Sequence, residues 1–123
     1  MTTRIFKKKR SHLEQHFQSA LVRDLRKILP GDCVMVAFPA GGGGVIRGKI
    51  LKASGLEPGV PDLLFFYRSC TRAMELKTKV GRVSKAQRAM HARLLGAGVL
   101  VETVRTLDEA LDALRSWDIP LRV

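Results

Sequence analysis

The chain has 123 residues, 46% hydrophobic and 27% charged, which suits one globular domain whose core needs no disulfide or metal. Lys and Arg total 22 against 11 Asp and Glu, and the formal net charge of +11 favours a nucleic-acid partner over a membrane surface. No stretch approaches the ~18 apolar residues of a membrane span and no apolar signal core is seen, so we expect a cytoplasmic protein.

The first half of the chain predicts one helix and one strand. Residues 1–10 hold five basic side chains and predict a basic N-terminal arm, followed by a single domain over residues 11–123. Apolar residues at helical spacing predict a helix from about Ser11 to Leu29, and the apolar run 33–38 predicts a buried strand. A glycine-rich loop over residues 39–44 and a short helix around 47–53 are expected next.

The second half predicts a hairpin and a strand between two helices. The hairpin has strands Leu63 to Tyr67 and Arg72 to Lys79, with a turn at residues 68–71. A helix over 84–97, a strand over 99–104 and a helix over 107–116 follow. Because a strand–helix–strand crossover makes the last two strands parallel, we expect an α/β fold with a mixed central sheet flanked by helices.

Glu75 and Lys77 carry the first chemical signal. They alternate with Leu76 on the returning strand and therefore share one of its faces. Alone, this pattern is typical of a solvated ion pair. Asp62, at the start of the preceding strand, changes the interpretation because the hairpin brings it within direct or diagonal reach of both residues. A two-residue turn would place Asp62 opposite Glu75, and a four-residue turn would place it opposite Lys77.

These three side chains together predict phosphodiester hydrolysis. Two carboxylates with open positions suit Mg²⁺ (or Mn²⁺), which keeps several waters and binds substrate phosphate. A metal held by Asp62 and Glu75 can lower the pKa of an attacking water and contact a phosphate oxygen. Lys77 would orient that water or offset the charge that develops in the transition state.

Three segments carry a family resemblance: Gly55-x-x-x-Gly59-Val60-Pro61-Asp62, Glu75-Leu76-Lys77-Thr78-Lys79 and Gly81-Arg82-Val83-Ser84-Lys85-Ala86-Gln87. Together with Val104-Arg105-Thr106 they resemble the VRR-NUC (virus-type replication-repair nuclease) family over about residues 11–114. This family is a branch of the PD-(D/E)xK, or restriction-endonuclease-like, nucleases. The resemblance implies that fold, metal ligation by Asp62, Glu75 and the Leu76 carbonyl, and Lys77 as the catalytic lysine.

The resemblance also bears on substrate and assembly. Stand-alone family members, often from phages and bacteria, resemble Holliday-junction resolvases, which implies a structure-specific DNA endonuclease of DNA repair in a bacterial or phage-infected cell. Four-way junctions need two sites related by a two-fold axis, so a homodimer is expected. The first helix is one candidate interface. The other lies in C-terminal apolar residues that alternatively close the core, namely Leu111, Leu114, Trp117 and Ile119.

Glu14 and Gln87 carry two interpretations each. By resemblance, Glu14 is an additional acidic residue of the site and a further candidate metal ligand, and Gln87 is the family's helix glutamine near the site. However, Ser11-x-x-Glu14 and Ser84-x-x-Gln87 also fit capping boxes, in which the third helical residue reaches back to the cap amide. Both residues stay candidate catalytic residues on this evidence.

Basic and histidine side chains complete the candidate set. We expect seven cations near the site in sequence to bind DNA phosphates: Arg47, Lys49, Lys52, Lys79, Arg82, Lys85 and Arg88. Three histidines on predicted helices match no motif by their sequence spacing and are interpreted as surface or DNA-facing: His12, His16 and His91.

Two alternatives compete with a nuclease. Gly43-x-x-x-x-Gly48-Lys49 fits most of a P-loop, but Ile50 stands where Ser or Thr should hold Mg²⁺. A catalytically inactive basic DNA-binding module explains the charge equally well. It leaves the clustered carboxylates unexplained, since acidic residues at a DNA surface weaken binding unless a cation lies between.

Overall fold

The computed structural model describes residues 2–38, 55 and 57–123, with side chains of the first helix described from Leu13 onwards. The glycine-rich loop, the expected short helix around 47–53 and the P-loop-like segment lie outside the described residues. Three of the expected DNA-binding residues, Arg47, Lys49 and Lys52, lie outside them as well.

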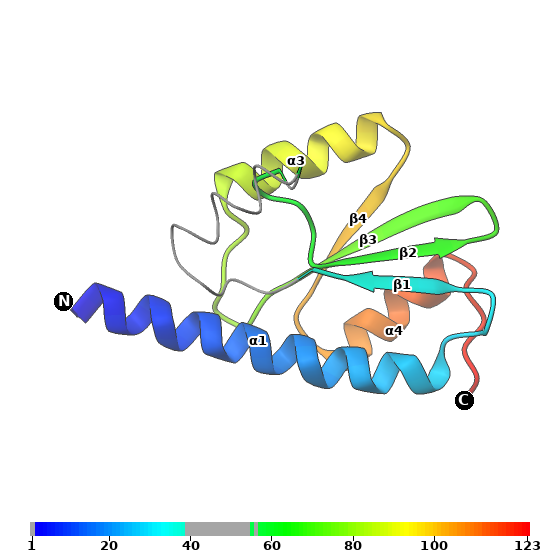
Figure 1. Cartoon of the computed structure of the whole chain (residues 1–123), viewed down its shortest axis with the longest axis horizontal. Coiled ribbons are helices and arrows are strands. Elements are labelled where there is room, and N and C mark those ends of the chain that lie inside the picture. Colours follow the sequence, from blue (N-terminus) through cyan, green and yellow to red (C-terminus); the bar gives the residue numbers. More distant parts are fainter. Residues whose placement is uncertain (1, 39–54, 56) are drawn as a thin grey trace.

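The described residues form an α/β fold with a four-stranded mixed sheet in the order β1-β2-β3-β4. The strands are β1 (Val34–Ala37), β2 (Leu63–Tyr67), β3 (Cys70–Leu76) and β4 (Leu100–Val104). The helices are α1 (Thr2–Ile28), α3 (Lys85–Gly96) and α4 (Leu107–Ser116). β3 is antiparallel to β2 and parallel to β4, so the predicted mixed sheet is confirmed. Figure 1 shows α1 and α4 on one side of the sheet and α3 on the other.

The first helix is longer than predicted. It begins at Thr2, so the basic residues up to Arg10 continue the helix instead of forming a separate arm. Lys and Arg are good helix formers, and no Gly or Pro occurs between Thr2 and Ile28 to end it. Ser11 is therefore inside the helix, and its predicted role as an N-cap for Glu14 is wrong. Within the described part of the chain no helix, α1 included, combines the length and apolar character that a bilayer crossing needs.

The hairpin between β2 and β3 has a two-residue turn, not the four-residue turn over 68–71 that was predicted. Arg68 and Ser69 have positive φ values of 48° and 65°, the backbone of a turn that matches the twist of paired strands. Strand β3 therefore begins at Cys70, and Leu63 pairs with Met74. This register places Asp62 opposite Glu75, which is the first of the two alternatives.

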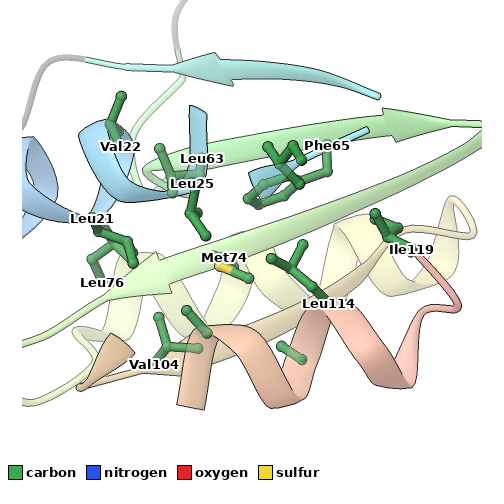
Figure 2. Packing of buried hydrophobic residues seen from close by; sticks show 13 residues of the cluster. Leu21, Val22, Leu25, Leu63, Phe65, Met74, Leu76, Val104, Leu114 and Ile119 are labelled. Carbon is green, nitrogen blue, oxygen red and sulfur yellow. The ribbon is translucent and has the colours of Figure 1, made fainter. Parts of the chain in front are cut away.

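The core lies between the sheet and the pair α1 and α4. Figure 2 shows side chains of β2 and β3 meeting those of both helices, among them Leu25, Phe65 and Met74. Leu114 and Ile119 are buried in this cluster, and Leu111 and Trp117 pack against it. The C-terminal apolar residues therefore help to close the core, as in the alternative interpretation. Leu114 and Ile119 are too deeply buried to form a dimer interface, whereas Leu111 and Trp117 are only partly buried.

Strand β1 is an exposed edge strand, and its prediction as a buried strand is wrong. Val34 is 56% exposed and Val36 is 37% exposed. The physical reason is the position of α3, which packs against β4 at the opposite edge of the sheet and does not reach β1. One half of this sheet face is thus covered by a helix, whereas Val34, Val36 and the neighbouring Phe66 are not.

Candidate active site

The candidate site lies where β2 begins and β3 ends. Asp62 directly precedes β2, and its Oδ2 accepts a hydrogen bond of 2.7 Å from the backbone N–H of Leu76. This bond fixes the Asp62 side chain across the end of β3, beside Glu75. Glu75 is 1% exposed, and Lys77, just past the end of β3, is 7% exposed. The structure therefore brings all three residues together, and neither Glu75 nor Lys77 belongs to a solvated ion pair.

The segment before Asp62 is held by close packing on α3. Gly59 has a φ of +81°, and a Cβ at this position would overlap the carbonyl of Ala86 in the first turn of α3. Only glycine tolerates both constraints without strain. Pro61 follows, fully buried, and leads directly to Asp62. The Gly-Val-Pro-Asp sequence thus places one carboxylate by docking the chain on the helix that also contacts Glu75.

Helix α3 presents two polar side chains to the carboxylate of Glu75. Gln87 Nε2 donates to Glu75 Oε2 at 3.1 Å, and His91 Nε2 lies 3.2 Å from Glu75 Oε1. Gln87 and His91 are four residues apart and therefore lie on the same helix face. Each carboxylate oxygen of Glu75 has one such partner, so the orientation of this carboxylate is fixed by α3.

Gln87 forms the predicted capping box and also contacts Glu75. Ser84 is the N-cap of α3, and its Oγ accepts from the backbone N–H of Gln87 at 3.1 Å. Gln87 Oε1 accepts from the backbone N–H of Ser84 at 2.8 Å, which completes the capping box. The Nε2 of the same side chain donates to Glu75, so the hydrogen bond of Oε1 with Ser84 orients Nε2 toward the site.

The electrostatics of the cluster are unusual for a set of surface residues. Burial, followed by the adjacent Asp62 carboxylate, raises the pKa of Glu75 from 4.5 to about 9, although Lys77 opposes the shift. Burial also raises the pKa of Glu14. The pKa of His91 is lowered, first by burial and then by the charge of Lys77. Without a cation the site therefore holds a proton on Glu75 that a divalent metal ion would displace.

Glu14 lies beside Lys77 rather than at a helix cap. Its Oε1 is 3.9 Å from Lys77 Nζ. The loop after β3 packs on this pair, since a Cβ at Gly81 would lie 3.3 Å from Glu14 Oε1 and 3.5 Å from Lys77 Cδ. The helix therefore brings a third carboxylate next to Lys77.

Sequence reasoning missed two residues. His91 was interpreted as lacking a partner, which is wrong because it contacts Glu75; its spacing of four from Gln87 was the available signal. Arg105 was noted only as part of a motif. Its Nη1 donates to the carbonyls of Thr78 and Gly81, both at 2.6 Å, and so holds the loop that follows Lys77. No local pattern pointed to that contact.

The donor set suits a metal with few protein ligands. Among the described residues, no three His, Cys, Asp or Glu side chains are arranged to hold a metal ion jointly. The closed three-ligand set with Glu14 therefore finds no support in this arrangement, in which Glu14 lies toward Lys77. Mg²⁺ binds through one or two carboxylates, with waters and substrate phosphate completing its shell. The adjacent oxygens of Asp62 and Glu75 fit that requirement.

The described basic candidates lie on the loop after β3 and on the start of α3. All four are exposed: Lys79, Arg82, Lys85 and Arg88. The first turn of α3 contains no acidic residue. Cations are unfavourable at a helix N-terminus unless an anion lies nearby. Arg88 Nη1 donates to the carbonyl of Val83 at 3.1 Å, just before the N-cap, and Lys85 is exposed.

Comparisons with models of protein families, with curated proteins and with solved structures find no match for this chain. The interpretation of the site therefore rests on the geometry and chemistry of its own residues.

Proposed function

We propose that this chain is a Mg²⁺-dependent DNA endonuclease with the PD-(D/E)xK core of the VRR-NUC family. One observation carries the proposal: Asp62 and Glu75 face each other on neighbouring strands, with Lys77 two residues further along the same edge. The charge of +11 supports a polyanionic substrate, because it outweighs the repulsion between the carboxylates of the site and DNA phosphates. An inactive DNA-binding module does not require two carboxylates in contact, of which Glu75 is buried and has a pKa of about 9.

The proposed metal site combines ligands with residues that orient them. Asp62, Glu75 and the main-chain carbonyl of Leu76 would hold Mg²⁺, which supplies Lewis acidity and a more acidic bound water. One oxygen of Asp62 accepts from the Leu76 N–H, and the same side chain shares a hydrogen bond with the protonated carboxyl of Glu75. The metal would replace that shared proton between the two side chains. Gln87 and His91 hold the carboxylate of Glu75 in one orientation. These contacts resemble the supporting hydrogen bonds that orient metal ligands in enzymes.

Lys77 supplies the fixed positive charge of the site. It is nearly buried, and its only ion pair within the described residues is the 3.9 Å contact with Glu14. A desolvated ammonium group at the reacting phosphate would stabilise the extra negative charge of the transition state. Glu14 limits where Lys77 points and would orient the attacking water through the same ion pair.

A cleavage assay tests the proposal. Purified protein is incubated with labelled duplex, branched and four-way-junction DNA in Mg²⁺, in Mn²⁺ and in EDTA. We expect cleavage in both metals and none in EDTA. Glu75→Gln should abolish cleavage, whereas Glu102→Gln, an exposed acidic residue on β4, should not. Binding of DNA without cleavage in any metal would establish the inactive module instead.

The same preparation tests assembly. We propose a homodimer for symmetric cleavage of four-way junctions, with α1 as a candidate interface. Light scattering at micromolar concentration should give about twice the 13.6 kDa chain mass. A monomer that cuts branched DNA but leaves four-way junctions intact would support nuclease activity and disprove the resolvase function.

A further inference from the structure

A groove between α1 and β1 leads away from the candidate active site. Its walls include side chains of α1 and one residue of β1, namely Gln18, Val22, Arg23, Arg26, Lys27 and Ala37. Gln18 is four residues beyond Glu14 and therefore lies one turn along the same helix face. Figure 2 shows Val22, one further turn along, pointing from α1 toward β1. The groove is thus continuous with the helix face that brings Glu14 to Lys77.

Gln18 has a polar atom that the described residues leave without a partner. The residue is only 8% exposed, and its Nε2 donates to the carbonyl of Phe38 at 2.6 Å. Its Oε1 is buried, and no described residue donates a hydrogen bond to it. Leaving a buried carbonyl unpaired is costly, so this atom indicates a ligand that carries an N–H group.

The charge and the apolar surface around Gln18 indicate which class of ligand the groove would bind. Arg23, Arg26 and Lys27 are exposed, and among the described residues the ion pair of Arg23 is a solvent-exposed 3.8 Å contact with Asp24. Arg26 and Lys27 also suit the last turn of a helix, so they alone would not identify a site. Combined with the N–H acceptor and with the apolar side chains Val22 and Ala37, they match a nucleotide, which presents phosphate, a flat apolar face and N–H donors.

We propose that this groove binds a single-stranded arm of the DNA substrate next to the active site. Arg23, Arg26 and Lys27 bind its phosphates, and Gln18 Oε1 accepts a hydrogen bond from an unpaired base. A duplex is excluded from this contact because its Watson–Crick edges are already paired, whereas splayed single-stranded bases reach such buried acceptors. The inference rests on the proposed nuclease function and adds duplex DNA with a single-stranded arm to its branched substrates.

Binding without cleavage tests the phosphate contacts. Fluorescence anisotropy in EDTA measures the affinity for a labelled single-stranded oligonucleotide, with the protein as wild type or as the triple variant Arg23→Ala, Arg26→Ala, Lys27→Ala. The matched control removes the same charge from exposed sites elsewhere: Arg68→Ala, Arg93→Ala and Arg115→Ala. We expect the groove variant to bind about tenfold more weakly and to lose about 2 units of log–log salt slope, about 0.7 for each phosphate contact. Equal losses of affinity in the two triple variants would disprove binding of single-stranded DNA in the groove.

A base analogue tests Gln18 separately. Gln18→Met keeps the size of the side chain and removes the acceptor. It should weaken binding of an ordinary oligonucleotide by about three- to tenfold, the range of one hydrogen bond, and weaken binding of an abasic oligonucleotide much less. Thermal unfolding checks that the variant is folded. Equal effects on both oligonucleotides would show that Gln18 contacts no base.

Cleavage in Mg²⁺ separates the inference from the proposed function. The wild type should cut a duplex with a ten-nucleotide single-stranded arm faster than the matching blunt duplex. The groove variant should lose more rate on the armed duplex than on the blunt one. If the wild type cuts both duplexes at one rate, the inference is overturned and the nuclease stands. If it cuts neither duplex, the proposed nuclease function is disproved, and the binding measurements alone decide whether the groove binds single-stranded DNA.

Discussion

The amide nitrogen of Gln87 donates a hydrogen bond of 3.1 Å to the buried carboxylate of Glu75. The oxygen of the same side-chain amide and the backbone N–H of Gln87 complete the capping box of α3 with Ser84. A helix cap and a site contact therefore share one side chain, and variants at the two ends of the box separate these roles.

Ser84→Ala removes the cap but leaves the Gln87 contact with Glu75. We expect it to lower the free energy of unfolding by about 1 kcal/mol, the usual value of a cap, with little change in kcat. Gln87→Ala removes both contacts and should lower kcat further at a similar loss of stability. Urea unfolding and steady-state kinetics measure the two quantities. Equal kcat values for both variants would assign Gln87 to capping alone.

The three central residues should be individually necessary. Asp62→Asn, Glu75→Gln and Lys77→Met should each lower turnover by two or more orders of magnitude, because one lost ligand or charge stabiliser removes about 3 kcal/mol of transition-state stabilisation. Glu14→Gln tests the ion pair with Lys77, since Glu14 makes no capping contact. Circular dichroism confirms folding. Full activity of Glu75→Gln would disprove the site.

Stability of the metal-free protein should depend on Glu75 and pH. The pKa of Glu75 is raised from 4.5 to about 9, so the folded state binds this proton more tightly than the unfolded chain. The corresponding stability is fully present below pH 4.5 and is lost as pH rises toward 9. Thermal unfolding in EDTA should therefore show wild type declining across this window more steeply than Glu75→Gln. Mg²⁺ should restore stability at the alkaline end, because the metal replaces the proton. Parallel pH profiles for the two proteins would contradict this.

Much of the fold was predictable because its signals are local. The bounds of α4 and the cap at Ser84 follow from apolar periodicity and from cap residues next to it in sequence. The helical start at Thr2 was not predicted, because a basic run lacks apolar periodicity even where its helix propensity is high. The exposure of β1 depends on which half of the sheet α3 covers, and no pattern within β1 carries that information.

The site was predictable in its residues and only partly in its geometry. Asp62, Glu75 and Lys77 follow from strand alternation and a hairpin, but the register stayed open between two turn lengths. Arg68 and Ser69 decide it by adopting a left-handed backbone without glycine, which sequence does not signal. The contact of His91 with Glu75 depends on how α3 lies on the sheet, which is tertiary information.

Gly59 should be required for the position of Asp62. Gly59→Ala combines a positive φ of 81° with an overlap against the Ala86 carbonyl, and should cost more than about 1 kcal/mol of stability. Gly98→Ala is the matched control, since its φ of 88° is similar and nothing lies within 4 Å of the added Cβ. Gly98→Ala should lose stability from strain alone and keep its activity. If Gly59→Ala is as active as Gly98→Ala, the docking of this segment on α3 does not position Asp62.

Arg105 should hold the loop that carries the phosphate-binding cations. Its guanidinium bonds the carbonyls of Thr78 and Gly81 at 2.6 Å each, and the loop between them includes Lys79. Each charge-assisted hydrogen bond contributes about 1.5 kcal/mol or more, so losing both should raise local opening of the loop at least about tenfold. Arg105→Ala should therefore speed trypsin cleavage after Lys79 and weaken DNA binding.

The control for Arg105 is Arg115→Ala, which removes one exposed cation from α4 and leaves the loop contacts intact. Arg105→Lys keeps the charge, but its ammonium ends one atom short of the position of Arg105 Nη1, which makes both contacts, so it should resemble Arg105→Ala in proteolysis. Mg²⁺ and DNA together should slow trypsin in the wild type by holding the loop closed. If Arg105→Ala and Arg115→Ala are cleaved after Lys79 at the wild-type rate, the two carbonyl contacts do not order the loop, and the position of Lys79 is set by the packing of Gly81 on Glu14 and Lys77 instead.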